Sequence, residues 1–257
     1  MLVALKGNIM LNDEKMLEKR FAELSARAFS RGIRQYSDFL SLAGQSVLLQ
    51  MKLQTRVTFI GGFDTAERCI ACFEPTDLDY DEAPPIACIC IEPISQKFAD
   101  KLSHRDFLGS LIGLGIRREV LGDIVIHENC GYLICSEDIA EYITDTLTKV
   151  RHTDVKCYIV DKPPSISTAL PEISSVVIAS ERIDAIVAAV FNISRSDSQS
   201  RFDHEKVFIS GRLIQSHSAM PKPGDIISVR GLGRFIYEGV ERETKKGKLR
   251  VMVRKFS

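Results

Sequence analysis

The chain has 257 residues, of which 45% are apolar and 26% charged, and its 34 basic side chains balance 34 acidic ones. This composition is sufficient for packed cores and excludes fibrous, collagen-like and wholly disordered proteins. No apolar run approaches the roughly 18 residues of a membrane helix, so no membrane partner is expected. The apolar start of the chain is too short to predict a secretory signal, and seven cysteines, an odd number, favour a reduced, cytoplasmic location.

The zero net charge is unevenly distributed. Residues 1–180 carry 19 basic and 25 acidic side chains, whereas residues 181–257 carry 15 and 9. Residues 230–257 alone hold 9 basic and 3 acidic side chains. A basic terminal block on a neutral chain indicates a module that meets phosphate groups, although the charge alone fits a solvated surface equally well.

Residues 1–53 have the pattern of a helical segment. Apolar residues spaced by three and four predict a first helix that starts at Asn12 or Asp13 and stops near Gly32. A second helix is predicted after Ser37, with an inward apolar stripe that reaches Met51. Nothing in this segment suggests chemistry, so we interpret it as a helical hairpin for packing or partner contact.

Residues 54–162 change to a mixed pattern of short strands and helices. Such a mixture predicts an α+β sandwich in which helices pack against a mainly antiparallel sheet. Residues 163–180 begin with a Pro/Ser-rich stretch and are predicted to form a linker. The expected strands are 56–60, 69–73, 86–91, 123–127, 132–135 and 155–160, with helices at about 103–114 and 139–147.

Residues 181–257 predict two short helices separated by three residues, followed by small strands. Apolar positions from Ile183 to Phe191 mark one face of the first helix. At the start of the second, either Ser194 with Asp197 or Ser196 with Gln199 fits a capping box. The free N–H groups of that helix start would suit a phosphate.

Basic residues of this last segment are expected to converge on one concave face that binds RNA. Two glycines lie between Arg230 and Arg234, where they would let the backbone approach a ligand closely. Arg182 has an alternative structural role, because it could instead pair with Asp184 or Asp225. The predicted RNA-binding residues are Arg182, Ser194, Arg195, Ser196, Arg201, Lys206, Gly211, Arg212, Arg230 and Arg234.

This pattern resembles the S4-type RNA-binding domain. The resemblance covers roughly 60 residues and implies RNA binding. Two positions depart from it: Glu205 stands where the family usually has glycine, and Ser210 where it usually has asparagine. Both departures bear on the turn geometry of the small hairpin. The matching residues are Arg182 with Asp184, residues 194–196, residues 207–211, Gly224 with Asp225, and residues 229–231.

A second informative stretch covers residues 103–118. Ser103 and Asp106 fit a helix cap, and two adjacent arginines follow the glycines that end the helix. Its His-Arg-Asp sequence is shared with the kinase catalytic loop, but Leu111 replaces the required asparagine, so we exclude a kinase. We interpret the stretch as a possible second contact with RNA or the ribosome, formed by His104, Arg105, Arg117 and Arg118.

Together with residues 119–124 and 230–234, this stretch resembles the YlmH family over nearly the whole chain. The resemblance implies an N-terminal helical segment, a central RRM-like α+β sandwich and a C-terminal S4-type domain with a basic hairpin. It also implies a cytoplasmic, non-enzymatic protein without a cofactor or small-molecule substrate. Its implied partners are ribosomal RNA and tRNA on the large ribosomal subunit. The implied roles are quality control of stalled nascent chains or translation-linked cell division.

Other chemistry was weighed against these hypotheses. Cys69 and Cys72, followed by Cys88 and Cys90, suggest a zinc site, but residues three apart on a strand face opposite ways. Buried thiols acting as small apolar residues are a better interpretation, so no metal is expected. Two histidines, 104 and 127, are interpreted as structural, and the acidic stretch 74–82 as a solvated loop.

The alternative function is an RNA-modifying enzyme, similar to a pseudouridine synthase, that uses the C-terminal domain for substrate delivery. In the central domain, Asp106 is the only counterpart of the catalytic aspartate of such an enzyme. It lies on a predicted helix and has bulky neighbours, whereas the catalytic motif requires small residues. A division scaffold that acts through the N-terminal helices is compatible with RNA binding. The sequence therefore favours a binding protein over an enzyme.

Overall fold

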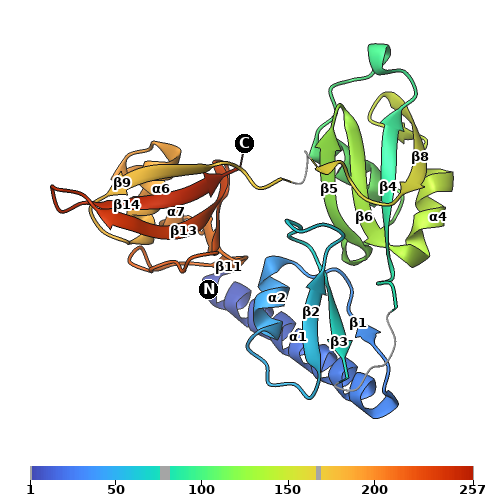
Figure 1. The fold of residues 1–257 in the computed structure, drawn as a ribbon, viewed down its shortest axis with the longest axis horizontal. Helices are drawn as coiled ribbons and strands as arrows, with labels where there is room; N and C mark the ends of the chain where they lie inside the picture. The colour runs from blue at the N-terminus through green and yellow to red at the C-terminus, as the bar shows by residue number, and fades with distance from the viewer. Residues whose placement is uncertain (1, 76–81, 166–168, 257) are drawn as a thin grey trace. The chain divides into compact units, whose positions relative to one another are not determined.

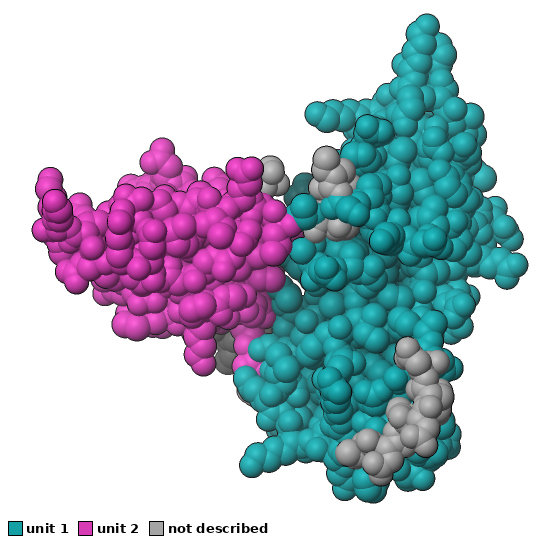
Figure 2. All heavy atoms as spheres, viewed as in Figure 1, with its two compact units in different colours: residues 1–169 teal, residues 170–257 magenta. Residues whose placement is uncertain are grey.

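The computed structural model describes residues 2–75, 82–165 and 169–256, with side chains from residue 14 onward. The chain divides into two compact units, residues 1–169 and 170–257 (Figure 2). The first unit contains two sheets with their own apolar clusters, and the second contains one sheet with a separate apolar core. Among the described residues, no helix combines the length and apolar content that crossing a membrane requires.

The first unit begins with a long helix that covers a small sheet (Figure 1). The sheet is antiparallel, in the order β1-β3-β2. Phe73 of β3 packs against Phe21 of the helix, with ring centroids 6.2 Å apart. The elements are α1 (Leu2–Arg31), β1 (Gln35–Tyr36), α2 (Leu42–Leu48), β2 (Arg56–Ile60) and β3 (Ile70–Glu74).

Two predictions for the N-terminal segment are wrong in extent. The first helix starts at Leu2 and runs through the predicted cap, although it ends where expected. The second covers only Leu42–Leu48 and is capped by Ser41, because the preceding residues are extended and bond to β3. The expected helical hairpin is therefore a helix packed on a sheet.

The predicted boundary at residue 54 does not coincide with a structural division. Strands β2 and β3 were expected in the central domain, but they pair with β1 and pack on α1. The physical reason is that Ala71 and Phe73 place their side chains in the core beneath α1. Residues 56–74 therefore belong structurally with the N-terminal segment.

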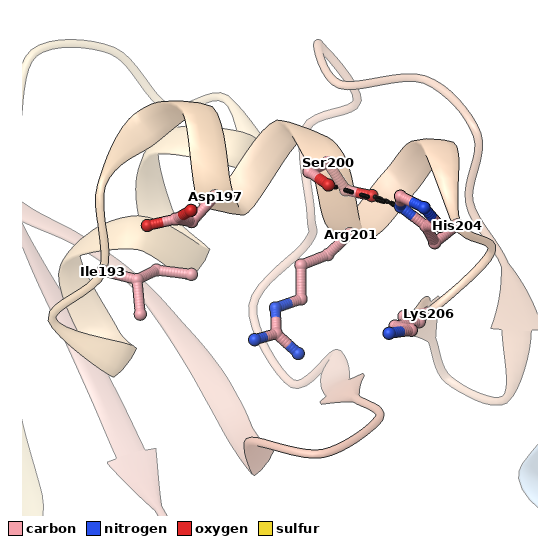
Figure 3. A pocket seen from close by; sticks show the side chains of 6 residues that line it. All are labelled: Ile193, Asp197, Ser200, Arg201, His204 and Lys206. Carbon is pink, nitrogen blue, oxygen red and sulfur yellow. Dashed lines mark hydrogen bonds between the residues drawn. The ribbon is translucent and has the colours of Figure 1, made fainter.

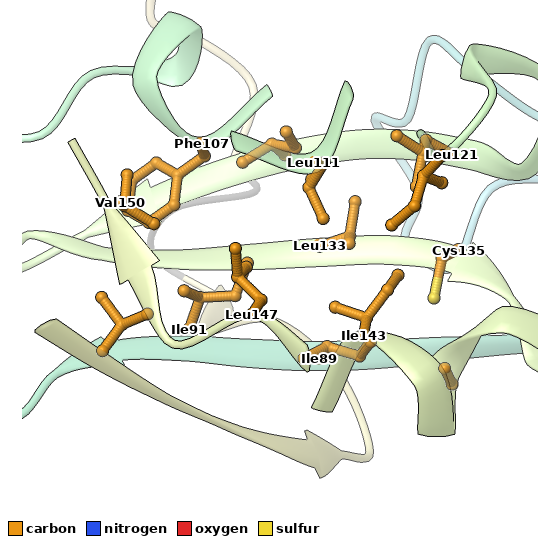
Figure 4. Packing of buried hydrophobic residues seen from close by; sticks show 14 of the residues in the cluster. Ile89, Ile91, Phe107, Leu111, Leu121, Leu133, Cys135, Ile143, Leu147 and Val150 are labelled. Carbon is orange, nitrogen blue, oxygen red and sulfur yellow. The ribbon is translucent and has the colours of Figure 1, made fainter. Parts of the chain in front are cut away.

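The central sheet has the β-α-β-β-α-β order of an RRM-like fold, formed by β4, α3, β5, β6, α4 and β8. All its pairings are antiparallel, in the order β5-β6-β4-β8-β7. Side chains of α3 and α4 fill one face of this sheet, as Figure 4 shows. The predicted α+β class is confirmed. The elements are β4 (Ile86–Pro93), η1 (Gln96–Phe98), α3 (His104–Gly113), η2 (Arg118–Val120), β5 (Leu121–His127), β6 (Cys130–Ser136), α4 (Glu137–Thr146), β7 (Lys149–Val150) and β8 (Thr153–Val160).

A network of polar and apolar contacts joins the two sheets of the first unit. The Arg68 guanidinium donates to the carbonyls of Phe39, Arg118 and Leu121. The Asp123 carboxylate accepts the backbone N–H of Glu67 at 2.6 Å. These bonds satisfy polar groups that the contact removes from water.

The second unit contains a six-stranded antiparallel sheet in the order β11-β10-β12-β13-β14-β9, with α6 and α7 packed against it. Strand β9 lies inside the predicted linker 163–180, so that prediction is wrong for residues 173–178. Their alternating side chains place Val176 and Ile178 in the core. The elements are β9 (Ile173–Ile178), α6 (Ile183–Phe191), α7 (Arg195–Asp203), β10 (Val207–Ile209), β11 (Arg212–Leu213), β12 (Ile226–Val229), β13 (Gly233–Glu243) and β14 (Leu249–Lys255).

Two expectations fall partly outside the described residues. Most of the acidic stretch 74–82 lies there, as do residues 166–168 of the predicted linker.

Candidate RNA-binding surface

A buried carboxylate organises the start of both helices in the second unit. Asp184, in the first turn of α6, has a fully buried side chain. Arg182 donates to it through Nε and Nη2, each at 3.1 Å. Arg195, the first residue of α7, donates from the other side at 3.4 Å, and Gln199 donates at 3.2 Å. One carboxylate therefore holds two of the predicted RNA-binding arginines.

Burial of Asp184 by itself raises the pKa of its carboxyl group. Hydrogen bonds from Arg182 and Gln199 and the charge of Arg195 outweigh this effect, so the pKa lies below its ordinary value. Asp184 is consequently ionised at neutral pH. The side chains of Arg182 and Arg195 remain 38% and 48% exposed, so each keeps an edge toward solvent. The alternative of an Arg182–Asp184 pair is confirmed.

The start of α7 is capped by its own residues. Ser194 Oγ accepts the N–H of Asp197 at 3.0 Å and lies 2.7 Å from the Asp197 carboxylate. Ser196 Oγ lies 2.9 Å from Ser194 Oγ. The first of the two predicted caps is therefore the one that forms. Because a carboxylate already occupies this helix start, the structure gives Ser194 and Ser196 a capping role and does not favour a phosphate there.

A polar pocket of about 240 Å³ lies on the opposite flank of α7 (Figure 3). Arg201, His204 and Lys206 line it together with Asp197, Ser200 and Ile193. In Figure 3, the Arg201 side chain extends from α7 toward the side where Lys206 lies. The His204 ring is held by a 2.7 Å contact between Nδ1 and the Ser200 carbonyl.

Arg230 does not line this pocket, but its backbone bonds to two residues that do. Arg201 donates to the Arg230 carbonyl at 3.2 Å, and the Arg230 N–H donates to the Lys206 carbonyl at 2.9 Å. The Arg230 guanidinium lies over the Phe208 ring, 4.6 Å from its centroid, which orients it. We call Arg201, Lys206 and Arg230 the α7 cationic group.

The two glycines next to this group have left-handed backbone conformations. Gly231 and Gly233 have φ values of +84° and +116°, which other residues rarely adopt. Arg234 follows them, with its guanidinium 4.4 Å from the Phe256 ring centroid. These glycines leave the backbone between the two arginines bare.

The two departures from the S4-type pattern fall on strained positions. Glu205 and Ser210 have φ values of +54° and +46°, the region that favours glycine and asparagine. The structure therefore explains the residue types typical of that family at these positions. Ser210 is held by a 3.1 Å hydrogen bond to Asp225, and the turn continues through Gly211 at φ +78°.

The predicted cations thus form two groups on α7 and its neighbours. Arg195 and Gln199 face Asp184, whereas Asp197, Arg201 and His204 line the pocket. At 3.6 residues per turn, these sets occupy different sides of the helix. Arg212 lies on the edge strand β11 and shares none of these contacts within the described residues. Most of the cations that were expected on one concave face therefore lie in two groups. Arg182 and Arg195 surround Asp184, and three of the others form the α7 cationic group.

The four residues of the second predicted contact, in the first unit, also differ in their surroundings. Arg118 donates to the carbonyls of Leu121 and Gly122 at 3.0 and 2.9 Å, and burial lowers its pKa to about 10. Its role is structural, which corrects the expectation of an RNA contact. His104, Arg105 and Arg117 are exposed.

The thiols that suggested a metal site are buried. Burial raises the pKa of Cys69 to about 11 and that of Cys88 to about 12, so both remain protonated. Within the part of the chain that the structure describes, no three histidine, cysteine or acidic side chains form a cluster suited to a metal ion.

Sequence reasoning missed several residues that shape the surface. The pairing of Asp184 with Arg182 was considered, but its contacts with Arg195 and Gln199 were not, because they need the packing of α6 against α7. His204 and Phe208 carried no signal beyond their proximity to basic residues in the sequence.

An RRM-like domain and a separate unit, in which two helices pack on a six-stranded sheet, define a modular α+β protein. Residues 86–162 match the family model described as "Putative RNA-binding domain in YlmH". The chain is 32% identical over 221 residues to "Ribosome-associated protein quality control protein P2" of Bacillus subtilis (strain 168), covering 84% of each protein. It also resembles the solved structure "Cell division protein ylmH from Streptococcus pneumoniae", with a TM-score of 0.48 and 20% identity, over 61% of this chain and 95% of that one.

The chain therefore belongs to the YlmH family.

Proposed function

We propose that this protein binds structured RNA of the ribosome through its C-terminal unit and that it acts without catalysing a reaction. The observation that carries the proposal is the α7 cationic group: Arg201 and Lys206 line a polar pocket, and both bond to the backbone of Arg230, whose guanidinium lies over the Phe208 ring. Arginine and lysine side chains at a polar concavity suit the phosphate backbone of RNA.

A more specific role is proposed from the named relative in Bacillus subtilis. Because the Bacillus subtilis protein is named for ribosome-associated quality control, we propose a cytoplasmic role in that process. The C-terminal unit would then act as an S4-type domain on ribosomal RNA or tRNA of the large subunit. The helix pair, the turn with Gly231 and Gly233, and the positive φ at Glu205 and Ser210 support this assignment.

The test compares two double variants of the full chain. Arg201→Ala with Arg230→Ala removes two cations of the α7 cationic group. Lys222→Ala with Lys245→Ala removes two exposed cations of the same unit that do not line the pocket. Binding to purified large ribosomal subunits is measured by co-sedimentation, and binding to tRNA by fluorescence anisotropy, across a series of salt concentrations.

The first variant should weaken binding about tenfold or more and lower the salt slope of log K by about 2, because two phosphate contacts are lost. The control variant should change affinity only slightly. Equal effects of the two variants, with unchanged circular dichroism, would overturn the proposed site. A nucleotide modification that disappears from RNA of a deletion strain would favour the enzyme alternative.

A further inference from the structure

A groove of about 550 Å³ lies on the helix side of the central sheet, in the first unit. One wall is α3, and the other is formed by the end of α4 and the turn between β7 and β8. The two walls come from residues 105–114 and 146–151, which are far apart in sequence. Arg105, from the predicted second contact, lines it.

Three cations line this groove: Arg105, Lys149 and Arg151. Arg105 forms no hydrogen bond or ion pair among the residues that the structure describes. The side chains of Lys149 and Arg151 are 57% and 50% exposed, and their carboxylate partners lie 3.4 and 3.6 Å away. Such exposed pairs are weak, so both cations are available to a stronger anion.

The acidic residue of the groove, Asp106, is the carboxylate partner of Arg151 and also caps α3. The Asp106 carboxylate accepts the Ser103 N–H at 2.8 Å and the Ser103 hydroxyl at 2.6 Å, as the cap of α3. The hydroxyl groups of Ser110, Thr146 and Thr148 also line the groove. The lining is therefore rich in hydrogen-bond donors, which suits phosphate and ribose oxygens.

Gly109 leaves a gap in the α3 wall, although no neighbouring group requires a glycine at this position. A glycine inside a helix costs about 1 kcal/mol relative to alanine. A Cβ atom at this position would meet no other atom within 4 Å. The missing side chain exposes bare helix backbone to the groove, where a ligand strand can approach closely.

The opposite face of the sheet is less suited to RNA. RRM domains stack bases on aromatic side chains of that face. Here Phe39 and Ile70 of the same unit cover Cys88 and Ile134, which are buried. The Tyr158 hydroxyl on the open part donates to Glu92, which also pairs with Lys156 at 3.2 Å. On this part of the face, the positive charge of Lys156 is therefore already balanced by Glu92.

We infer that the groove between α3 and the β7–β8 turn binds the phosphate backbone of an RNA strand, as a contact separate from the C-terminal unit. This inference rests on the proposed function in one respect, namely that the ligand is RNA. Arg105, Lys149 and Arg151 contact phosphates, the hydroxyl groups contact the sugar–phosphate backbone, and Gly109 admits the strand.

The sharpest test places a negative charge in the groove. Gly109→Glu introduces a carboxylate into open space and favours the helix, so the fold is retained. Gly113→Glu is the matched control, because Gly113 lies one turn further on α3, also has open space, and does not line the groove. Filter binding of labelled large-subunit ribosomal RNA to the full chain measures both.

Gly109→Glu should weaken RNA binding about tenfold relative to Gly113→Glu. Arg105→Gln with Lys149→Gln should do the same relative to Lys97→Gln with Lys156→Gln, and should lower the salt slope by about 2. Equal affinities within each matched pair would overturn the inference, as would a loss confined to Tyr158→Ala.

The two RNA contacts fail in distinguishable ways. If only the α7 variant Arg201→Ala with Arg230→Ala weakens binding, the groove is excluded and the proposed function stands. If only the groove variants weaken binding, the C-terminal site is excluded and the groove stands. If both contacts are real and separate, their effects on the binding free energy should add.

Discussion

At the scale of single residues, Asp184 accounts for much of the order around the two C-terminal helices. Its carboxylate is buried, and the side chains of Arg182, Arg195 and Gln199 all donate to it. Two guanidinium groups that would repel each other are thereby held close together. The hydroxyl of Ser198 also donates to the Asp184 carbonyl at 2.8 Å, which ties α7 to α6.

Asp184→Asn should make the second unit less stable at neutral pH by about 2 kcal/mol, because the buried charge pairing is lost. The pKa of Asp184 is lowered in the folded chain. Its stabilising effect is therefore complete above the unfolded pKa of about 4 and is lost as the pH falls through the folded pKa. Urea unfolding of the variant and the natural chain, followed over this pH range, measures the difference.

The two unfolding free energies should converge at the acid end of the range. Asp203→Asn is the control, since Asp203 is largely exposed and, among the described residues, its carboxylate pairs with His217 alone, at 3.2 Å. A stability difference for Asp184→Asn that stays constant with pH would contradict this account.

At the scale of elements, β9 shows how part of the predicted linker becomes part of a core. It pairs with β14 along its length, from Ile178 opposite Leu249 to Ile173 opposite Arg254. Ile178 is buried, and Val176 packs against the same cluster. Without β9, the backbone of β14 would become an open sheet edge.

A fragment of residues 170–257 should therefore unfold cooperatively and resist more urea than a fragment of residues 181–257. The shorter fragment loses the burial of Ile178, worth about 2 kcal/mol, as well as the β14 pairing. Urea titration by circular dichroism compares the two fragments. Identical midpoints would show that β9 is dispensable.

At the scale of the whole molecule, the chain carries separate apolar cores in its two units. Phe107 is buried in the core of the central sheet, and Phe235 in the core of the second unit. A core phenylalanine replaced by alanine usually costs about 3–5 kcal/mol. Such a change should therefore act on the unit that contains it.

Calorimetry should resolve two thermal transitions, one for each unit. Phe107→Ala should lower the temperature of one transition, and Phe235→Ala that of the other, so each variant is the control for its counterpart. Both transitions moving together in either variant would contradict independent units.

Much of the local structure was predictable from the sequence. Apolar spacing located α3, α4 and α6, and short β-branched or apolar runs located β2 and β4. The cap formed by Ser103 with Asp106, and that formed by Ser194 with Asp197, were also predicted. These features depend on residues three or four positions apart, so the local sequence contains them.

The sequence by itself thus determined helices α3, α4 and α6, most strands and the basic character of the last third. Only the tertiary structure decided which distant groups meet: β9 with β14, Arg118 with the carbonyls of β5, and Arg105 with Arg151 across one groove. It also divided the expected cationic face, because a buried carboxylate is satisfied by whatever donors the packing of α6 on α7 brings within reach. Local sequence patterns specify helices and strands, whereas contacts between residues far apart in the sequence depend on how those helices and strands pack.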